Sequence, residues 1–172
     1  MKNRLIILSD LHGFKAEKYQ QILENHFEIK FYDSRELAKI DKKKSKEKNH
    51  QDFVNFGIEK AVENLLKKEK NQINILAFSV GGVIAWKFAL KTKNVKYLTA
   101  ISSTRLRYEV KKPSAKINLY FGEKDNYKPD LKWFEELKLE NKTYKNFGHE
   151  LYEDKIIAEK ISQEILQEEF LR

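Results

Sequence analysis

Short apolar runs recur along the chain and alternate with amphipathic stretches. Several of the runs are apolar at nearly every position, which is typical of strands covered on both faces of a sheet. We therefore predict six strands, which span residues 4–9, 27–33, 73–79, 95–102, 115–122 and 142–147.

The stretches between these runs have the spacing of helices. They predict helices over residues 15–25, 53–69, 81–91, 131–138 and 154–170. Asp52 and Asp154 stand where an N-cap would begin the second and the last of these helices. Residues 34–52 are mostly polar, and we expect an irregular excursion there. The alternation of strand and helix predicts one α/β domain over residues 1–172, with a doubly wound, mostly parallel sheet of six strands flanked by helices.

The stretch ILAFSVGGVIAW carries the strongest sign of chemistry. Ser79 ends a predicted strand, and a helix begins almost directly after it. So sharp a turn, a nucleophile elbow, needs small residues two positions before and two positions after the serine, where Ala77 and Gly81 stand. At the start of the helix, the N–H of Val80 would be free to donate to an oxyanion. The alternative is an ordinary strand-to-helix turn with an incidental serine.

Two further residues complete a set that suits nucleophilic catalysis. Asp125 follows the strand that ends in LYFG, and His149 follows the last predicted strand. Parallel strands present the residues after their carboxyl ends at one edge of the sheet, so both can converge on Ser79. An imidazole takes the serine proton near neutral pH, and a carboxylate orients the imidazole. We therefore predict Ser79 as nucleophile, His149 as base and Asp125 as the acid that orients the base.

These stretches resemble motifs of the α/β-hydrolase superfamily. AFSVGG resembles its nucleophile elbow, GEKD its acid loop and FGHE its histidine loop. The resemblance covers essentially the whole chain and implies a small, capless, bacterial serine esterase-like member. Its lid would be reduced to residues 103–114. The resemblance also implies a second oxyanion donor, a backbone N–H in the loop after the first strand: Phe14 is preferred, and Leu11 or His12 stay open.

The stretch SDLHG has a second interpretation. Asp10 and His12 after a strand also resemble the first metal-binding motif of the calcineurin-like phosphoesterases. Such a site needs several more Asp and His ligands, whereas the chain has four His in all and GHEL lacks the second His of a Gly-His-x-His pattern. We therefore expect no metal, and a metal-dependent phosphoesterase remains a remote alternative.

Composition and charge bear on which partners and which cellular compartment to expect. The net charge is +8, from 34 Lys and Arg against 26 Asp and Glu, but the lysines are dispersed, so we expect no nucleic-acid partner. The chain has no cysteine, which excludes disulfides and Cys-ligated metals. No apolar run approaches the roughly 18 residues of a membrane span. Without a recognisable export signal, the cytoplasm is the expected compartment.

Candidate substrate contacts follow the first strand and the strand after the elbow. Leu11 and His12 lie in the first group, and Arg105, Arg107 and Tyr108 lie in the second. The arginines would face an anionic acyl group or acyl carrier, unless they form an exposed basic loop. The sequence thus predicts a cofactor-independent serine hydrolase that acts on a small-molecule carboxylic ester or thioester through an acyl-enzyme. A non-catalytic binding protein with the same fold is the alternative.

Overall fold

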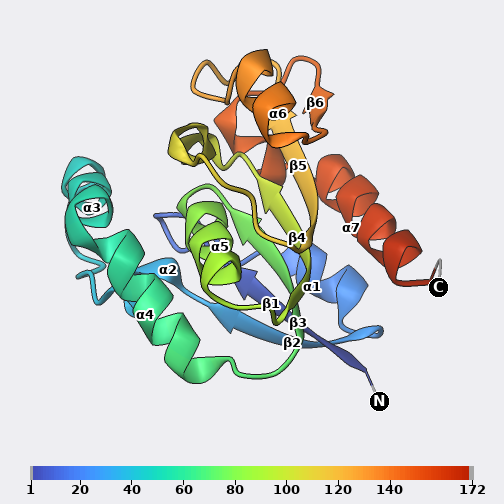
Figure 1. Ribbon diagram of the computed structural model, residues 1–172, viewed down its shortest axis with the longest axis horizontal. Helices are drawn as coiled ribbons and strands as arrows, with labels where there is room; N and C mark the ends of the chain where they lie inside the picture. Colours follow the sequence, from blue (N-terminus) through green and yellow to red (C-terminus); the bar gives the residue numbers. More distant parts are fainter. Residues whose placement is uncertain (1, 171–172) are drawn as a thin grey trace.

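Six strands form one sheet in the computed structural model, which describes residues 2–170 (Figure 1). Their order across the sheet is β2-β1-β3-β4-β5-β6, and every neighbouring pair runs parallel. The predicted doubly wound sheet is therefore confirmed, although β6 is shorter than predicted. The strands are β1 (Asn3–Leu8), β2 (Phe27–Tyr32), β3 (Ile73–Phe78), β4 (Val95–Ile101), β5 (Lys116–Gly122) and β6 (Lys142–Tyr144).

Helices cover both faces of the sheet. One face carries α1 and α7, and the other carries α2, α4, α5 and α6. Among the described residues no helix combines the length and apolar character that a membrane crossing requires. The α-helices are α1 (Glu17–Leu23), α2 (Ser34–Ala38), α3 (Lys46–Asp52), α4 (Ile58–Lys68), α5 (Val80–Lys91), α6 (Leu131–Leu137) and α7 (Lys155–Phe170); the other turns are η1 (Phe53–Gly57, π-helical), η2 (Thr104–Tyr108) and η3 (His149–Glu153), the last two 3-10 helical.

The alternation of side chains along the strands divides the core into two layers. In β1, Leu5 and Ile7 pack towards α1 and α7, whereas Ile6 and Leu8 pack on the opposite face. All six residues of β3 are buried, because helices cover both sides of this central strand. The predicted near-continuous apolar runs are thus explained by burial on two faces.

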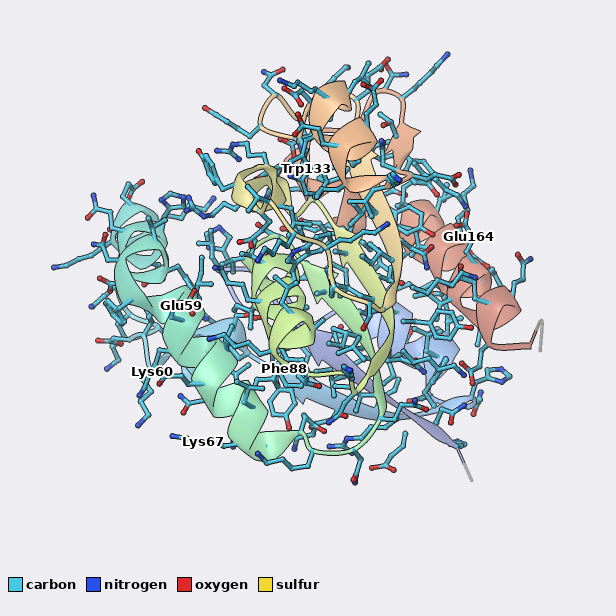
Figure 2. The ribbon with its side chains drawn as sticks, viewed as in Figure 1. Glu59, Lys60, Lys67, Phe88, Trp133 and Glu164 are labelled. Carbon is cyan, nitrogen blue, oxygen red and sulfur yellow. The ribbon has the colours of Figure 1, made fainter. Side chains whose placement is uncertain are left out.

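Helix α5 is buried on nearly all sides, as its residues Val80–Trp86, Phe88 and Ala89 show. Trp86 of α5 packs against Trp133 of α6, with ring centroids 5.9 Å apart. Farther out, α4 presents a charged outer side, on which Glu59 and Lys67 are exposed; Figure 2 labels these two residues and Trp133. The layer of α4 and α5 therefore encloses apolar rings and leaves its charges to solvent.

Two expectations for residues 34–69 are wrong. The polar excursion contains α2 and α3, and Asp52 does not begin a helix: its backbone is helical, with φ −61° and ψ −41°, and its carboxylate pairs with Lys44 at 2.6 Å. The N-cap is Ser45, whose hydroxyl accepts the N–H of Lys48. After this cap, α3, η1 and α4 follow one another without a break. Phe53 of η1 is buried, so the buried side of α4 extends towards α3.

The predicted cap of the last helix is confirmed. Oδ1 of Asp154 accepts the N–H groups of Ile156 and Ile157, at 2.9 and 3.0 Å. These are two of the donors that a helix leaves unpaired in its first turn. The cap therefore sets the point at which η3, the turn that begins with His149, ends and α7 begins.

Candidate active site

Ser79 occupies a strained turn between β3 and α5. Its φ of 50° and ψ of −117° lie where residues other than glycine are uncommon. A hydrogen bond from its N–H to the carbonyl of Ile101, 2.8 Å long, holds the turn to β4. A Cβ on Gly81 would lie 2.5 Å from the carbonyl oxygen of Ser9, so only glycine lets α5 approach the end of β1 this closely. The extra methyl of Ala77 is accommodated in the core, where that residue is fully buried.

The three residues predicted for catalysis come together at the carboxyl edge of the sheet. Oγ of Ser79 lies 3.0 Å from Nε2 of His149, and Nδ1 of His149 lies 2.7 Å from Oδ2 of Asp125. Asp125 is in the loop after β5, and His149 begins η3 after β6. Both distances are within hydrogen-bond reach, so the arrangement can carry a proton from the serine oxygen to the imidazole.

The surroundings of the pair set its charge states. Burial lowers the pKa of His149, but the hydrogen bond and negative charge of Asp125 outweigh burial, so the pKa lies above its ordinary 6.5. Burial raises the pKa of Asp125, but its hydrogen bond and attraction to His149, helped by the backbone N–H of Tyr127, leave the pKa below its ordinary 3.8. Asp125 is therefore ionised at neutral pH and stabilises a protonated His149.

The loop after β1 does not leave the N–H of Phe14, the preferred oxyanion donor, free to bind a substrate. The N–H of Phe14 already donates to Oδ1 of Asp10, at 2.9 Å, and the N–H of His12 donates to the same atom at 2.8 Å. Phe14 is therefore not a free donor. The N–H of Leu11 has no protein acceptor among residues 2–170, and Leu11 lines the cavity above Ser79. Leu11, which the sequence left open, takes the place of Phe14 as candidate.

Asp10 acts on the backbone of this loop. Asp10 is 2% exposed. Besides the two N–H groups that Oδ1 accepts, Oδ2 accepts the hydroxyl hydrogen of Tyr152 at 2.9 Å. His12, its neighbour in the metal-motif interpretation, is exposed. Within residues 2–170 no three His, Asp or Glu side chains are grouped so that they could hold a metal ion. The two oxygens of Asp10 are thus occupied in shaping the loop.

A cavity of about 640 Å³ opens above Ser79. The predicted contact residues Leu11, Arg105, Arg107 and Tyr108 line it, but His12 does not, so His12 is withdrawn as a substrate contact. Val80, the first residue of α5, also reaches the cavity, and its N–H has no partner within the helix. Ser79, His149 and the two residues with unpaired backbone N–H groups, Leu11 and Val80, therefore line the same cavity.

Several lining residues were missed in the sequence. One wall comes from α3, which lies where an irregular excursion was expected, and from η1, at the start of the helix predicted over residues 53–69. No local signal marks either segment as part of a site. Tyr127 carried a weak signal, since it follows Asp125 by two positions in GEKDNY. The missed residues are His50, Phe53, Val54, Thr104, Tyr127 and Glu150.

Similarity to known proteins is found among solved structures. The sequence matches no protein-family model, and no curated protein matches it. Solved structures do: alpha/beta hydrolase domain-containing protein 10 from mouse superposes with a TM-score of 0.69 at 12% identity, covering 97% of this chain and 90% of that one. Est1E from Butyrivibrio proteoclasticus, with ferulic acid bound, gives 0.66 at 15% identity, with 96% and 89% covered.

A third match is a serine hydrolase involved in carbazole degradation, the CarC enzyme. Its TM-score is 0.66 at 13% identity, and the match covers 99% of this chain and 92% of that one. In each case nearly the full length of both chains is included. The sheet order, the strained turn after β3 and these superpositions together show that the chain has the α/β-hydrolase fold.

Proposed function

We propose that this protein is a serine hydrolase that cleaves carboxylic esters or thioesters through an acyl-enzyme. The observation that carries the proposal is the continuous relay from Oγ of Ser79 through both ring nitrogens of His149 to Asp125. Each link has the residue type and the distance that acyl transfer requires. The strained backbone of Ser79 supports it further, because that conformation presents the hydroxyl at the cavity floor.

In the proposed reaction, Ser79 attacks the acyl carbon while His149 takes the serine proton on Nε2. Asp125 stabilises the imidazolium through Nδ1–H. His149 then gives the proton to the leaving alcohol or thiol, and the acyl group stays on Ser79 as an ester. A water attacks that ester with His149 again as base, which releases the acid and restores the serine.

The oxyanion of each tetrahedral intermediate would be bound by two backbone N–H groups. Val80 supplies one from the amino end of α5, where the positive end of the helix dipole also favours negative charge. Leu11 supplies the other from the loop after β1. The close approach of Gly81 to the end of β1 is what brings these two segments to the same side of Ser79.

An active-site-directed fluorophosphonate tests the proposal directly. We expect it to label Ser79 of the wild-type protein and to leave Ser79→Ala unlabelled, with the site identified by peptide mass spectrometry. Hydrolysis of 4-nitrophenyl butyrate should fall by roughly 10⁶-fold in Ser79→Ala, as for loss of the nucleophile in a well-studied serine protease. Ser103→Ala is the matched control, because Ser103 is a buried serine at the same edge of the sheet that lies outside the cavity lining.

The same experiment distinguishes a serine hydrolase from a non-catalytic binding protein with the same fold. A folded wild-type protein that is neither labelled nor active on a panel of short-chain esters and thioesters would be a binding protein with a hydrolase fold. Labelling that persists in Ser79→Ala would place the reactive group elsewhere and refute the relay.

A further inference from the structure

We propose that the substrate carries an anionic group, a carboxylate or a phosphate, which Arg105 binds at the wall of the cavity. The inference rests on the proposed function of that site and names its substrate class. It begins with a feature of η2: two arginines line the cavity that contains Ser79 and His149, and neither forms an ion pair with a carboxylate of residues 2–170.

Arg105 is the free member of the pair. Arg105 is half-buried, and its guanidinium lies over the ring of Tyr108, 5.0 Å from the centroid. No hydrogen bond within residues 2–170 occupies its N–H groups. An arginine stacked on an aromatic ring has few rotamers left, so its donors are already held in place for a planar anion.

Arg107 has a different task. Its guanidinium donates to the carbonyl of Thr104 at 2.9 Å, to the carbonyl of Tyr127 at 3.2 Å and to the hydroxyl of Tyr108 at 2.8 Å. These acceptors are neutral, so the positive charge is not compensated. Arg107 therefore fixes the ring on which Arg105 stacks and adds a second positive charge to the same wall.

The rest of the cavity fits the uncharged part of such a substrate. Leu11, Phe53, Val54 and Val80 supply apolar side chains around Ser79. One acid, Glu150, also lines the cavity, but it is exposed and adjoins His149, whose pKa its charge helps to raise. The cavity thus combines an apolar centre and a cationic wall, which suits an acyl chain that ends in an anion.

Binding to Ser79→Ala tests the inference without depending on turnover. Calorimetry would compare monoethyl glutarate with ethyl pentanoate, a neutral ester of equal acyl length, and with ethyl 4-phosphonobutanoate. We expect the anionic esters to bind roughly 10- to 100-fold more tightly than the neutral one, as charged hydrogen bonds allow. The preference should shrink at high salt, and the better of the two anionic esters identifies the anion.

Variants in the same background assign the preference to Arg105. Adding Arg105→Met should remove most of the difference between anionic and neutral esters, and Arg105→Lys should restore part of it, since charge returns without the planar fork. Lys111→Gln is the matched control, because it removes one exposed positive charge farther along the same segment, outside the cavity lining. Its preference should equal that of Ser79→Ala alone.

Two outcomes overturn the inference: equal binding of anionic and neutral esters, or a preference that Arg105→Met and Lys111→Gln reduce to the same extent. Both would leave the labelling of Ser79 untouched. Conversely, an anion preference in a protein whose Ser79 takes no label would refute the proposed hydrolysis and keep the binding site. The two proposals therefore fail in distinguishable ways.

Discussion

Tyr152 donates its hydroxyl hydrogen to Oδ2 of Asp10 across 2.9 Å, and this bond joins η3 to the loop after β1. Tyr152 lies on η3, three positions after His149, and the two rings stand edge to face at 6.3 Å. Through Oδ1, the same carboxylate holds the N–H groups of His12 and Phe14. The path of the loop after β1 is therefore fixed relative to His149 by one buried carboxylate.

Tyr152→Phe should lower kcat by roughly 10-fold and change KM less. The variant keeps the ring but leaves Oδ2 of Asp10 buried without its donor, which costs about 1–3 kcal/mol of stability and frees the loop that carries the N–H of Leu11. A looser donor weakens transition-state binding more than substrate binding. Steady-state kinetics on 4-nitrophenyl butyrate and urea unfolding measure the two effects.

Tyr120→Phe separates loop positioning from stability alone. The hydroxyl of Tyr120 donates to Glu164 of α7 at 2.5 Å, and neither residue lines the cavity. This variant should also lose stability but keep its kcat. Equal kcat values in the two variants would contradict a positioning role for the bond between Tyr152 and Asp10.

Activity should fall as the pH drops through the pKa of His149. The neutral imidazole would be the active form, and the pKa is raised, so the acid limb of kcat/KM, which reports the free protein, should have its midpoint above pH 6.5. Asp125→Asn removes the hydrogen bond and charge that raise the pKa while burial continues to lower it. We expect the residual activity, reduced by about 10⁴-fold, to show an acid limb at lower pH.

Glu150→Gln provides a graded comparison for this pH profile. Its charge contributes less than that of Asp125 to the raised pKa of His149, so its limb should move in the same direction by a smaller amount. Rate measurements between about pH 4 and 9 on a neutral ester would show both shifts. An acid limb that stays in place in Asp125→Asn would mean that another group titrates there.

The three residues proposed for catalysis could be located from the sequence because their signals are local. A serine between two small residues marks the strained turn, and the order Ser79, Asp125, His149 follows strand ends that all meet at one edge. The choice of Leu11 over Phe14 as the proposed oxyanion donor could not be made from the sequence, because it depends on the contacts of Asp10. That carboxylate captures the N–H of Phe14 and is itself held by Tyr152, which is 142 positions away in the chain.

The helical segment before β3 could not be predicted fully from the sequence either. The run DKKKSKEK has the composition of a solvated loop, and only Ser45 within it marks a helix start. The helix continues through η1 because Phe53 and Ile58 are buried in the core cluster that also contains residues of α2, α4 and α5. That burial also turns Val54 and His50 towards the cavity, and so this wall of the site could not be predicted from local pattern.

Gly81→Ala should be the most damaging of the single-methyl additions near the nucleophile. The new Cβ would lie 2.5 Å from the carbonyl oxygen of Ser9 and 2.7 Å from that of Leu8, and a backbone cannot yield as a flexible side chain can. We expect a loss of roughly 1–3 kcal/mol or more, read from the urea midpoint. Gly148→Ala is the control, since its Cβ would meet nothing within 4 Å; equal midpoints would refute the close approach of α5 to β1.

His12 and His149 should respond in opposite ways to substitution by alanine. His12 lies outside the cavity, so its side chain has no position from which to exchange a proton with a substrate there. Partial burial and nearby positive charges lower its pKa despite the opposing charge of Asp10. His12→Ala keeps the backbone N–H that Asp10 binds and should retain kcat within about 3-fold, whereas His149→Ala should lose roughly 10⁶-fold. A severe loss in a folded His12→Ala protein, measured on the same ester, would return a chemical role to that imidazole and to the Asp-x-His pair.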